Sequence, residues 1–122
     1  MDKLDTIFAM QKALDDDITA RRHLEGIPPE EWIQKDILAL LVELGEVLDE
    51  VNYKWWKNKK PLEPEKLHEE LIDVLHFFVS MCIRAGLDAE GLFAVYQEKN
   101  KENFARQQGL SQKKGYAPDE AK

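Results

Sequence analysis

The chain has 122 residues, in which 24 Asp and Glu outnumber 17 Lys and Arg to give a net charge of −7. This length favours a single domain that can bury a core, and the acidic balance disfavours binding to a nucleic-acid polymer. One cysteine, Cys82, excludes a disulfide within the chain and a zinc site built from cysteines. No apolar run reaches the length of a membrane span and the first residues hold no signal-peptide core, so we expect a cytoplasmic protein without a membrane partner.

Apolar residues recur at helical spacing in four segments, and the alternation typical of strands is absent. The segments predicted to be helical are residues 2–24, 30–58, 64–85 and 88–108. Prolines separate the first three segments, and Gly86 precedes the fourth. Short connections favour antiparallel neighbours, so the predicted fold is all-α and resembles a four-helix bundle with antiparallel helices.

Two pairs of carboxylates lie beside the apolar stripes of the second and third segments. Glu43 and Glu46 are three residues apart, as are Glu70 and Asp73, so each pair shares one helix face. If these helices pack through their stripes, four carboxylates meet at the edge of the interface. Such a group stays ionised only when cations offset it, and all-oxygen ligands suit Mg²⁺, Mn²⁺ or Ca²⁺. The pattern therefore indicates phosphate chemistry assisted by a divalent metal.

The alternative is a pair of solvated acidic faces that interact with lysines, which is the usual role of a single E-x-x-E on a helix. Finding two such pairs on consecutive helices makes the two interpretations about equal. Glu65 and His68 have the spacing of a di-iron ligand pair, but they lie on the far side of the helix from Glu70 and Asp73. No second such pair exists, so iron is disfavoured.

Polar residues inside apolar stripes suggest a ligand. Gln11 lies within the stripe of the first segment, where either neighbouring backbone satisfies its amide or the amide reads a nucleobase. Of Trp55 and Trp56, one is free to stack on a planar ligand. The fourth segment carries a polar stripe made of Tyr96, Lys99, Asn100, Asn103, Arg106 and Gln107. Cationic donors together with a metal site are what a nucleoside triphosphate requires.

These residues together resemble the all-α, dimeric dUTPases, which belong to the superfamily of MazG-like nucleotide pyrophosphohydrolases. The motifs that carry the similarity are Met10-Gln11, Glu43-Leu44-Gly45-Glu46, Lys54-Trp55-Trp56, Glu70 to Phe77, and Lys99-Asn100 through Arg106-Gln107 to Gly115-Tyr116. They span nearly the whole chain in the expected order. The chain departs from the family pattern at Asp15, where an Asn is expected.

The resemblance implies a magnesium-dependent enzyme that hydrolyses dUTP, and also dUDP, with dUTP giving dUMP and pyrophosphate. It implies a homodimer in which Mg²⁺, or Mn²⁺ in its place, is held by Glu43, Glu46, Glu70 and Asp73. Glu43 or Glu46 would activate the attacking water. The residues implied to bind deoxyuridine are Gln11, Trp56, His76 and Phe77, and those implied to bind the phosphates are Lys99, Asn103, Arg106 and Tyr116. We expect one catalytic domain over residues 1–108 and a polar tail over residues 109–122 that closes over the phosphates.

Two other functions compete with this one. The first is a pyrophosphohydrolase of the same superfamily that acts on dCTP or a modified nucleotide. The second is a non-catalytic helical module that binds a divalent ion or another protein, which would not require Lys99, Asn103 and Arg106 on one face.

Overall fold

The computed structural model describes residues 1–116 and contains four helices and no strand in that range. The helices are α1 (Lys3–Arg21), α2 (Pro29–Glu50), α3 (Pro64–Arg84) and α4 (Ala89–Gln107). The prediction of an all-α, bundle-like fold is confirmed. Within residues 1–116, no helix has both the length and the apolar character that crossing a membrane requires.

The chain divides into two compact units. The first, Met1–Asp88, contains α1, α2 and α3, and the second begins at Ala89 and contains α4. The predicted boundary at residue 108 stays a prediction. Residues 117–122 of the predicted tail lie outside the described part of the chain.

Local sequence signals set most helix ends. Asp2 and Asp5 form a reciprocal capping box at the start of α1, and α2 and α3 each begin at a proline. At the end of α3, Gly86 has a positive φ of 84°, and the Leu87 amide donates to the Cys82 carbonyl at 2.8 Å. This bond is part of a Schellman motif, for which glycine has the lowest steric cost.

The second helix is shorter than predicted. It was expected to reach residue 58, but α2 ends at Glu50. Asn52 adopts a left-handed conformation with φ of 57°, and its side chain forms two hydrogen bonds with the Lys60 backbone, of 3.0 and 2.9 Å. Asparagine tolerates this conformation, and the contact with Lys60 stabilises it. The Trp55–Trp56 pair therefore lies in the connection of residues 51–63 rather than on a helix.

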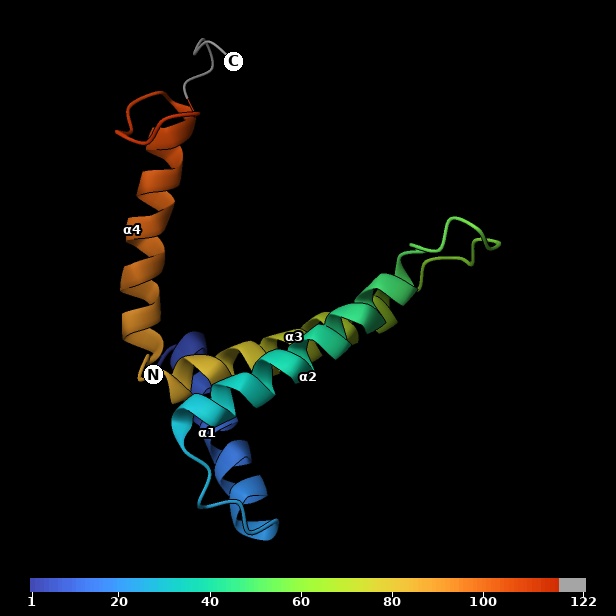
Figure 1. Cartoon of the computed structure of the whole chain (residues 1–122), viewed down its shortest axis with the longest axis vertical. Coiled ribbons are helices and arrows are strands. Elements are labelled where there is room, and N and C mark those ends of the chain that lie inside the picture. The colour runs from blue at the N-terminus through green and yellow to red at the C-terminus, as the bar shows by residue number, and fades with distance from the viewer. Residues whose placement is uncertain (117–122) are drawn as a thin grey trace. The chain divides into compact units, whose positions relative to one another are not determined.

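Within the first unit, α2 and α3 lie side by side and antiparallel, and most contacts between helices join these two. α1 packs on α3 near the end opposite the 51–63 connection (Figure 1). The predicted apolar stripe of α2 does not all face α3, since Leu41 is 57% exposed and Leu44 and Leu48 are also exposed. The stripe is wider than the surface that one neighbouring helix covers.

Candidate active site

A row of polar residues runs along the contact between α2 and α3, and we call it the polar seam. Its members on each helix are seven residues apart, which is close to two helical turns, so each set shares a face. Because the helices are antiparallel, the two sets meet as three tiers: Asp36 with Ser80, Glu43 with Asp73, and Glu50 with Lys66. The tiers differ in how their negative charge is compensated.

The tier nearest the 51–63 connection is compensated by lysines. Glu50, the last residue of α2, is only 4% exposed. One of its oxygens, Oε1, lies 3.4 Å from the ammonium of Lys60 and 3.4 Å from that of Lys66. A buried carboxylate is tolerated when nearby cations offset its charge. These contacts join the end of α2, the connection and the start of α3.

The tier at the other end joins all three helices of the first unit. The Ser80 hydroxyl donates to Oδ2 of Asp15 on α1 at 2.8 Å and lies close to the buried Asp36. Burial and the negative charge of Asp15 raise the pKa of Asp36, while Ser80 and the guanidinium of Arg84 lower it, with a net upward shift. Arg84 in turn lies over the Trp32 ring, 4.5 Å from its centroid. This tier has hydrogen-bonding and cationic neighbours.

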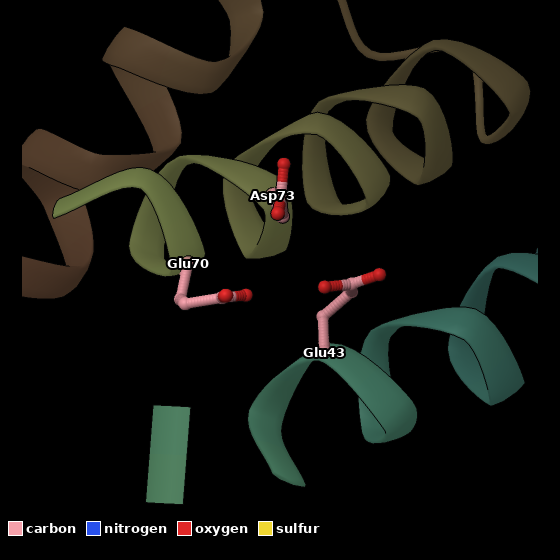
Figure 2. A group of neighbouring side chains, drawn as sticks. All are labelled: Glu43, Glu70 and Asp73. Atoms are coloured by element: carbon pink, nitrogen blue, oxygen red, sulfur yellow. The ribbon is translucent and has the colours of Figure 1, made fainter. Parts of the chain in front are cut away.

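The carboxylates of the central tier form no salt bridge in the described part of the chain. Glu43 from α2 and Glu70 from α3 extend their carboxylates into the space between the helices, and Asp73 lies beside them on α3 (Figure 2). One oxygen of each lies within 4.8 Å of those of the other two. Among residues 1–116, no lysine or arginine forms a salt bridge with any of the three.

Burial and neighbouring negative charges both raise the pKa of the two glutamates of this tier. Partial burial and the negative charges of Asp73 and Glu46 raise the pKa of Glu43. Partial burial and the charges of Glu46, Asp73, Glu43 and Glu50 raise the pKa of Glu70. A divalent cation between these carboxylates would reverse the repulsion, and their all-oxygen donor set fits Mg²⁺ or Mn²⁺. Three of the four predicted metal ligands are thus brought together.

Glu46, the fourth predicted ligand, lies at the edge of this group. It is exposed on α2, and its carboxylate is not one of the three whose oxygens lie within 4.8 Å of one another. Its negative charge nevertheless raises the pKa of both Glu43 and Glu70. It also lines a pocket of about 470 Å³ together with Glu50, Lys60 and Lys66. Glu46 is therefore placed between the central tier and an open cavity.

The predicted base-binding residues are brought together only in part. Gln11 is buried on α1, its amide donates to Asp15 at 2.9 Å, and its carbonyl oxygen lies 2.5 Å from Nδ1 of His76. Side chains rather than backbone therefore satisfy Gln11. Phe77 follows on α3 and is half-buried. Trp56 is 62% exposed and its recorded ring contacts are with Tyr53 and Trp55.

The predicted phosphate-binding residues lie in the second unit. Arg106 bonds to Glu102 at 3.1 Å and to the side-chain oxygen of Asn103 at 3.4 Å. Its guanidinium also lies 5.3 Å from the Tyr116 ring centroid. Lys99 is exposed on the same helix, two turns before Arg106. Arg106, Asn103 and Tyr116 thus form one cluster within this unit.

Sequence reasoning missed most of the polar seam outside its centre. Asp36, Glu50 and Lys66 were not singled out as site residues, and Ser80 was not noticed. The available signal was the seven-residue spacing of Asp36, Glu43 and Glu50. Positions seven residues apart on a helix are usually occupied by apolar residues, so this polar repeat is easily overlooked.

The raised pKa values predict how stability depends on pH without metal. A carboxyl whose pKa is raised above its ordinary value of 4.5 binds protons more readily in the folded chain. The contribution of this carboxyl to the free energy of unfolding therefore falls as the pH rises from about 4.5 through the raised pKa. We expect Glu70→Gln to raise the urea midpoint at pH 7 and to reduce the loss of stability between pH 5 and pH 7.

The same urea titrations can be repeated in the presence of Mg²⁺. Since a ligand that binds only the folded state stabilises it, Mg²⁺ should raise the urea midpoint of the wild type at pH 7 more than that of Glu70→Gln. Glu65→Gln, an exposed change in the first turn of α3, is the matched control and should behave as the wild type. An unchanged pH dependence in Glu70→Gln would show that the three carboxylates do not interact.

Part of the chain is similar to known phage proteins. Two phage proteins named dCTP pyrophosphatase are similar: that of Enterobacteria phage LZ5 is 48% identical over 54 residues, 42% of this chain and 31% of the relative. That of Enterobacteria phage T4 is 32% identical over 92 residues, 62% of this chain and 54% of the relative. The chain therefore spans about half or less of these relatives. No solved structure gives a significant match.

The family comparison covers a larger share of the chain. A family model described as dUTPase matches residues 3–90, which is nearly the whole of the first compact unit with its polar seam. This match includes the central tier and both residues of the Gln11–His76 contact. The chain belongs to the all-α dUTPase family.

Proposed function

We propose that the protein is a magnesium-dependent nucleotide pyrophosphohydrolase that converts dUTP to dUMP and pyrophosphate and also accepts dUDP. The observation that carries this proposal is the central tier, in which Glu43, Glu70 and Asp73 converge without a salt bridge to any lysine or arginine in the described part of the chain. Membership of the dUTPase family and similarity to two dCTP pyrophosphatases support the reaction class. Mn²⁺ is expected to replace Mg²⁺.

The reaction needs positioning and charge compensation more than covalent catalysis. Glu43, Glu70 and Asp73, with Glu46 at their edge, would hold the metal. When bound, Mg²⁺ offsets phosphate charge and lowers the pKa of water. Water adds to phosphorus, the bridging P–O bond breaks, and pyrophosphate leaves.

The two glutamates of α2 are the candidates for activating the water. Glu46 is the better placed of the two, because it is exposed beside a cavity whereas Glu43 lies within the group of three. A carboxylate in this position can accept the proton that water loses.

Recognition of the nucleoside is assigned to Gln11, His76, Phe77 and Trp56. The contact between Gln11 and His76 supports this part of the proposal, since it orients an amide and an imidazole next to each other. His76 follows Asp73 by one helical turn, so a nucleotide held at the central tier would reach it. Phe77 would crowd a ribose 2′-hydroxyl.

Recognition of the phosphates by α4 is a separate part of the proposal. Lys99, Asn103, Arg106 and Tyr116 supply the cationic and polar donors that a triphosphate requires. The cluster formed by Asn103, Arg106 and Tyr116 supports their acting together.

The second candidate substrate is dCTP, and the names of the two phage relatives favour it. The experiment that separates the candidates is a panel of dNTPs with Mg²⁺, monitored for pyrophosphate release. Higher kcat/KM for dUTP supports the main proposal, and higher kcat/KM for dCTP supports the second. Absence of turnover across the panel would instead favour a non-catalytic helical module.

Replacing Glu46 tests the assignment of the catalytic carboxylate. Glu46→Gln should lower kcat by a factor of about 10² to 10⁴, the usual contribution of a positioned general base. Helical content measured by circular dichroism should not change, because Glu46 is exposed. Glu31→Gln, an exposed change in the first turn of the same helix, is the control and should keep full activity. Undiminished turnover in Glu46→Gln would remove this residue from the mechanism.

We also propose that two copies of the chain form a homodimer through the exposed apolar residues of α2 and α3. Leu38, Leu41 and Val42 are 57–65% exposed, and Leu71 and Ile72 on α3 are about half exposed. Large apolar side chains exposed in this number on two neighbouring helices favour an interaction site. Light scattering should give twice the monomer mass of 14.2 kDa, and Leu41→Glu should shift the protein towards the monomer. A wild-type monomer at micromolar concentration would contradict the dimer.

A further inference from the structure

The pocket beside Glu46 is lined by lysines to which the proposed function assigns no role. Its volume is about 470 Å³, and four of its lining residues are lysines, Lys54, Lys57, Lys60 and Lys66. These come from the 51–63 connection and the first turn of α3, so they all belong to the first unit.

Two of these lysines are held in place by a buried residue. Lys60 and Lys66 both approach the same oxygen of Glu50, each at 3.4 Å, and Glu50 is 4% exposed. Their own side chains are 45% and 53% exposed, and both residues line the pocket. Each ammonium has three donors, and the contact with Glu50 occupies only part of them. One buried carboxylate thus orients two ammonium groups. The pocket as a whole is lined by four lysines and by the three carboxylates of Glu46, Asp49 and Glu50, so lysines exceed carboxylates by one.

The pocket adjoins the central tier. Glu46 lines its wall and also acts electrostatically on Glu70 and Glu43. The pKa of Lys66 is raised, mainly by Glu50 and also by the negative charge of Glu70, which lies one helical turn further along α3. Glu46 therefore borders both the central tier and the pocket, so a polyanion bound at the central tier would lie next to the pocket that contains the two lysines.

We propose that Lys60 and Lys66, oriented by Glu50, bind the pyrophosphate part of the nucleotide substrate and the pyrophosphate product. This inference rests on the proposed function and assigns a phosphate subsite in the first unit, in addition to the residues on α4. Lysine ammonium groups bind phosphate oxygens by charge-assisted hydrogen bonds. Glu50 is a positioning residue, since it acts through the lysines and not on the substrate.

The test measures binding of inorganic pyrophosphate in the presence of Mg²⁺ by isothermal titration calorimetry. Lys60→Gln and Lys66→Gln should each weaken binding by about tenfold, as expected for loss of one charge-assisted contact. The affinity for Mg²⁺ alone should stay as in the wild type, because neither lysine is a metal ligand. Lys59→Gln is the matched control, since Lys59 neighbours Lys60 but does not line the pocket.

A second set of measurements separates positioning from structure. Lys60→Gln and Lys66→Gln should raise KM for the preferred dNTP by about tenfold while changing kcat little, which a general loss of fold would not do. Glu50→Gln should also weaken pyrophosphate binding. Because Glu50 is buried, its variant is interpreted only together with the two lysine variants, which are at exposed positions.

The two proposals fail in different ways. If wild-type protein does not bind Mg²⁺-pyrophosphate, or if both lysine variants bind it as tightly as the wild type, the subsite is disproved whatever the activity. If the lysine variants lose pyrophosphate binding but the wild type turns over no dNTP, the subsite is upheld and the proposed reaction is not.

Discussion

The candidate site depends on uncompensated negative charge at the centre of the contact between α2 and α3. Glu43, Glu70 and Asp73 bring carboxylate oxygens to within 4.8 Å of one another, where like charges repel and partial burial strengthens the repulsion. The polar seam tolerates carboxylates at both ends because they have neighbours: Glu50 has two lysines, and Asp36 has Ser80 and Arg84. Only the centre needs a cation from outside the described residues, and this need is the physical basis for the proposed metal site.

The same seam explains how a short chain builds a site with few buried apolar residues. The compensated tiers fix the two helices relative to each other at both ends, so that the central carboxylates converge. Glu50 joins three segments, while Ser80 joins α3 to Asp15 on α1 and lies near Asp36 on α2. Buried polar groups of this kind specify one register of packing when their partners are in place. Register in turn decides whether Glu43 faces Asp73 or a neighbouring residue.

Much of the fold and half of the site followed from sequence patterns. Helical periodicity located all four helices, and proline and glycine positions predicted most of their ends within a few residues. The three-residue spacing within each pair correctly placed Glu70 and Asp73 on one helix face, and Glu43 and Glu46 on another. The end of α2 was wrong, because the left-handed conformation of Asn52 is stabilised by Lys60, eight residues away. Helical periodicity continues past such a residue and carries no sign of the contact.

The sequence by itself determined the residue types, the faces they share and therefore the chemistry available: carboxylates for a divalent cation, and amides and cations for a nucleotide. Only the tertiary structure decided which charges are neutralised. Nothing in the spacing of Glu50 distinguishes it from Glu43, since both lie on one face of α2 at the same heptad position. The antiparallel packing of α3 sets Lys66 against one and Asp73 against the other. Electrostatic energy depends on distances between helices, and these distances are fixed only when the helices pack.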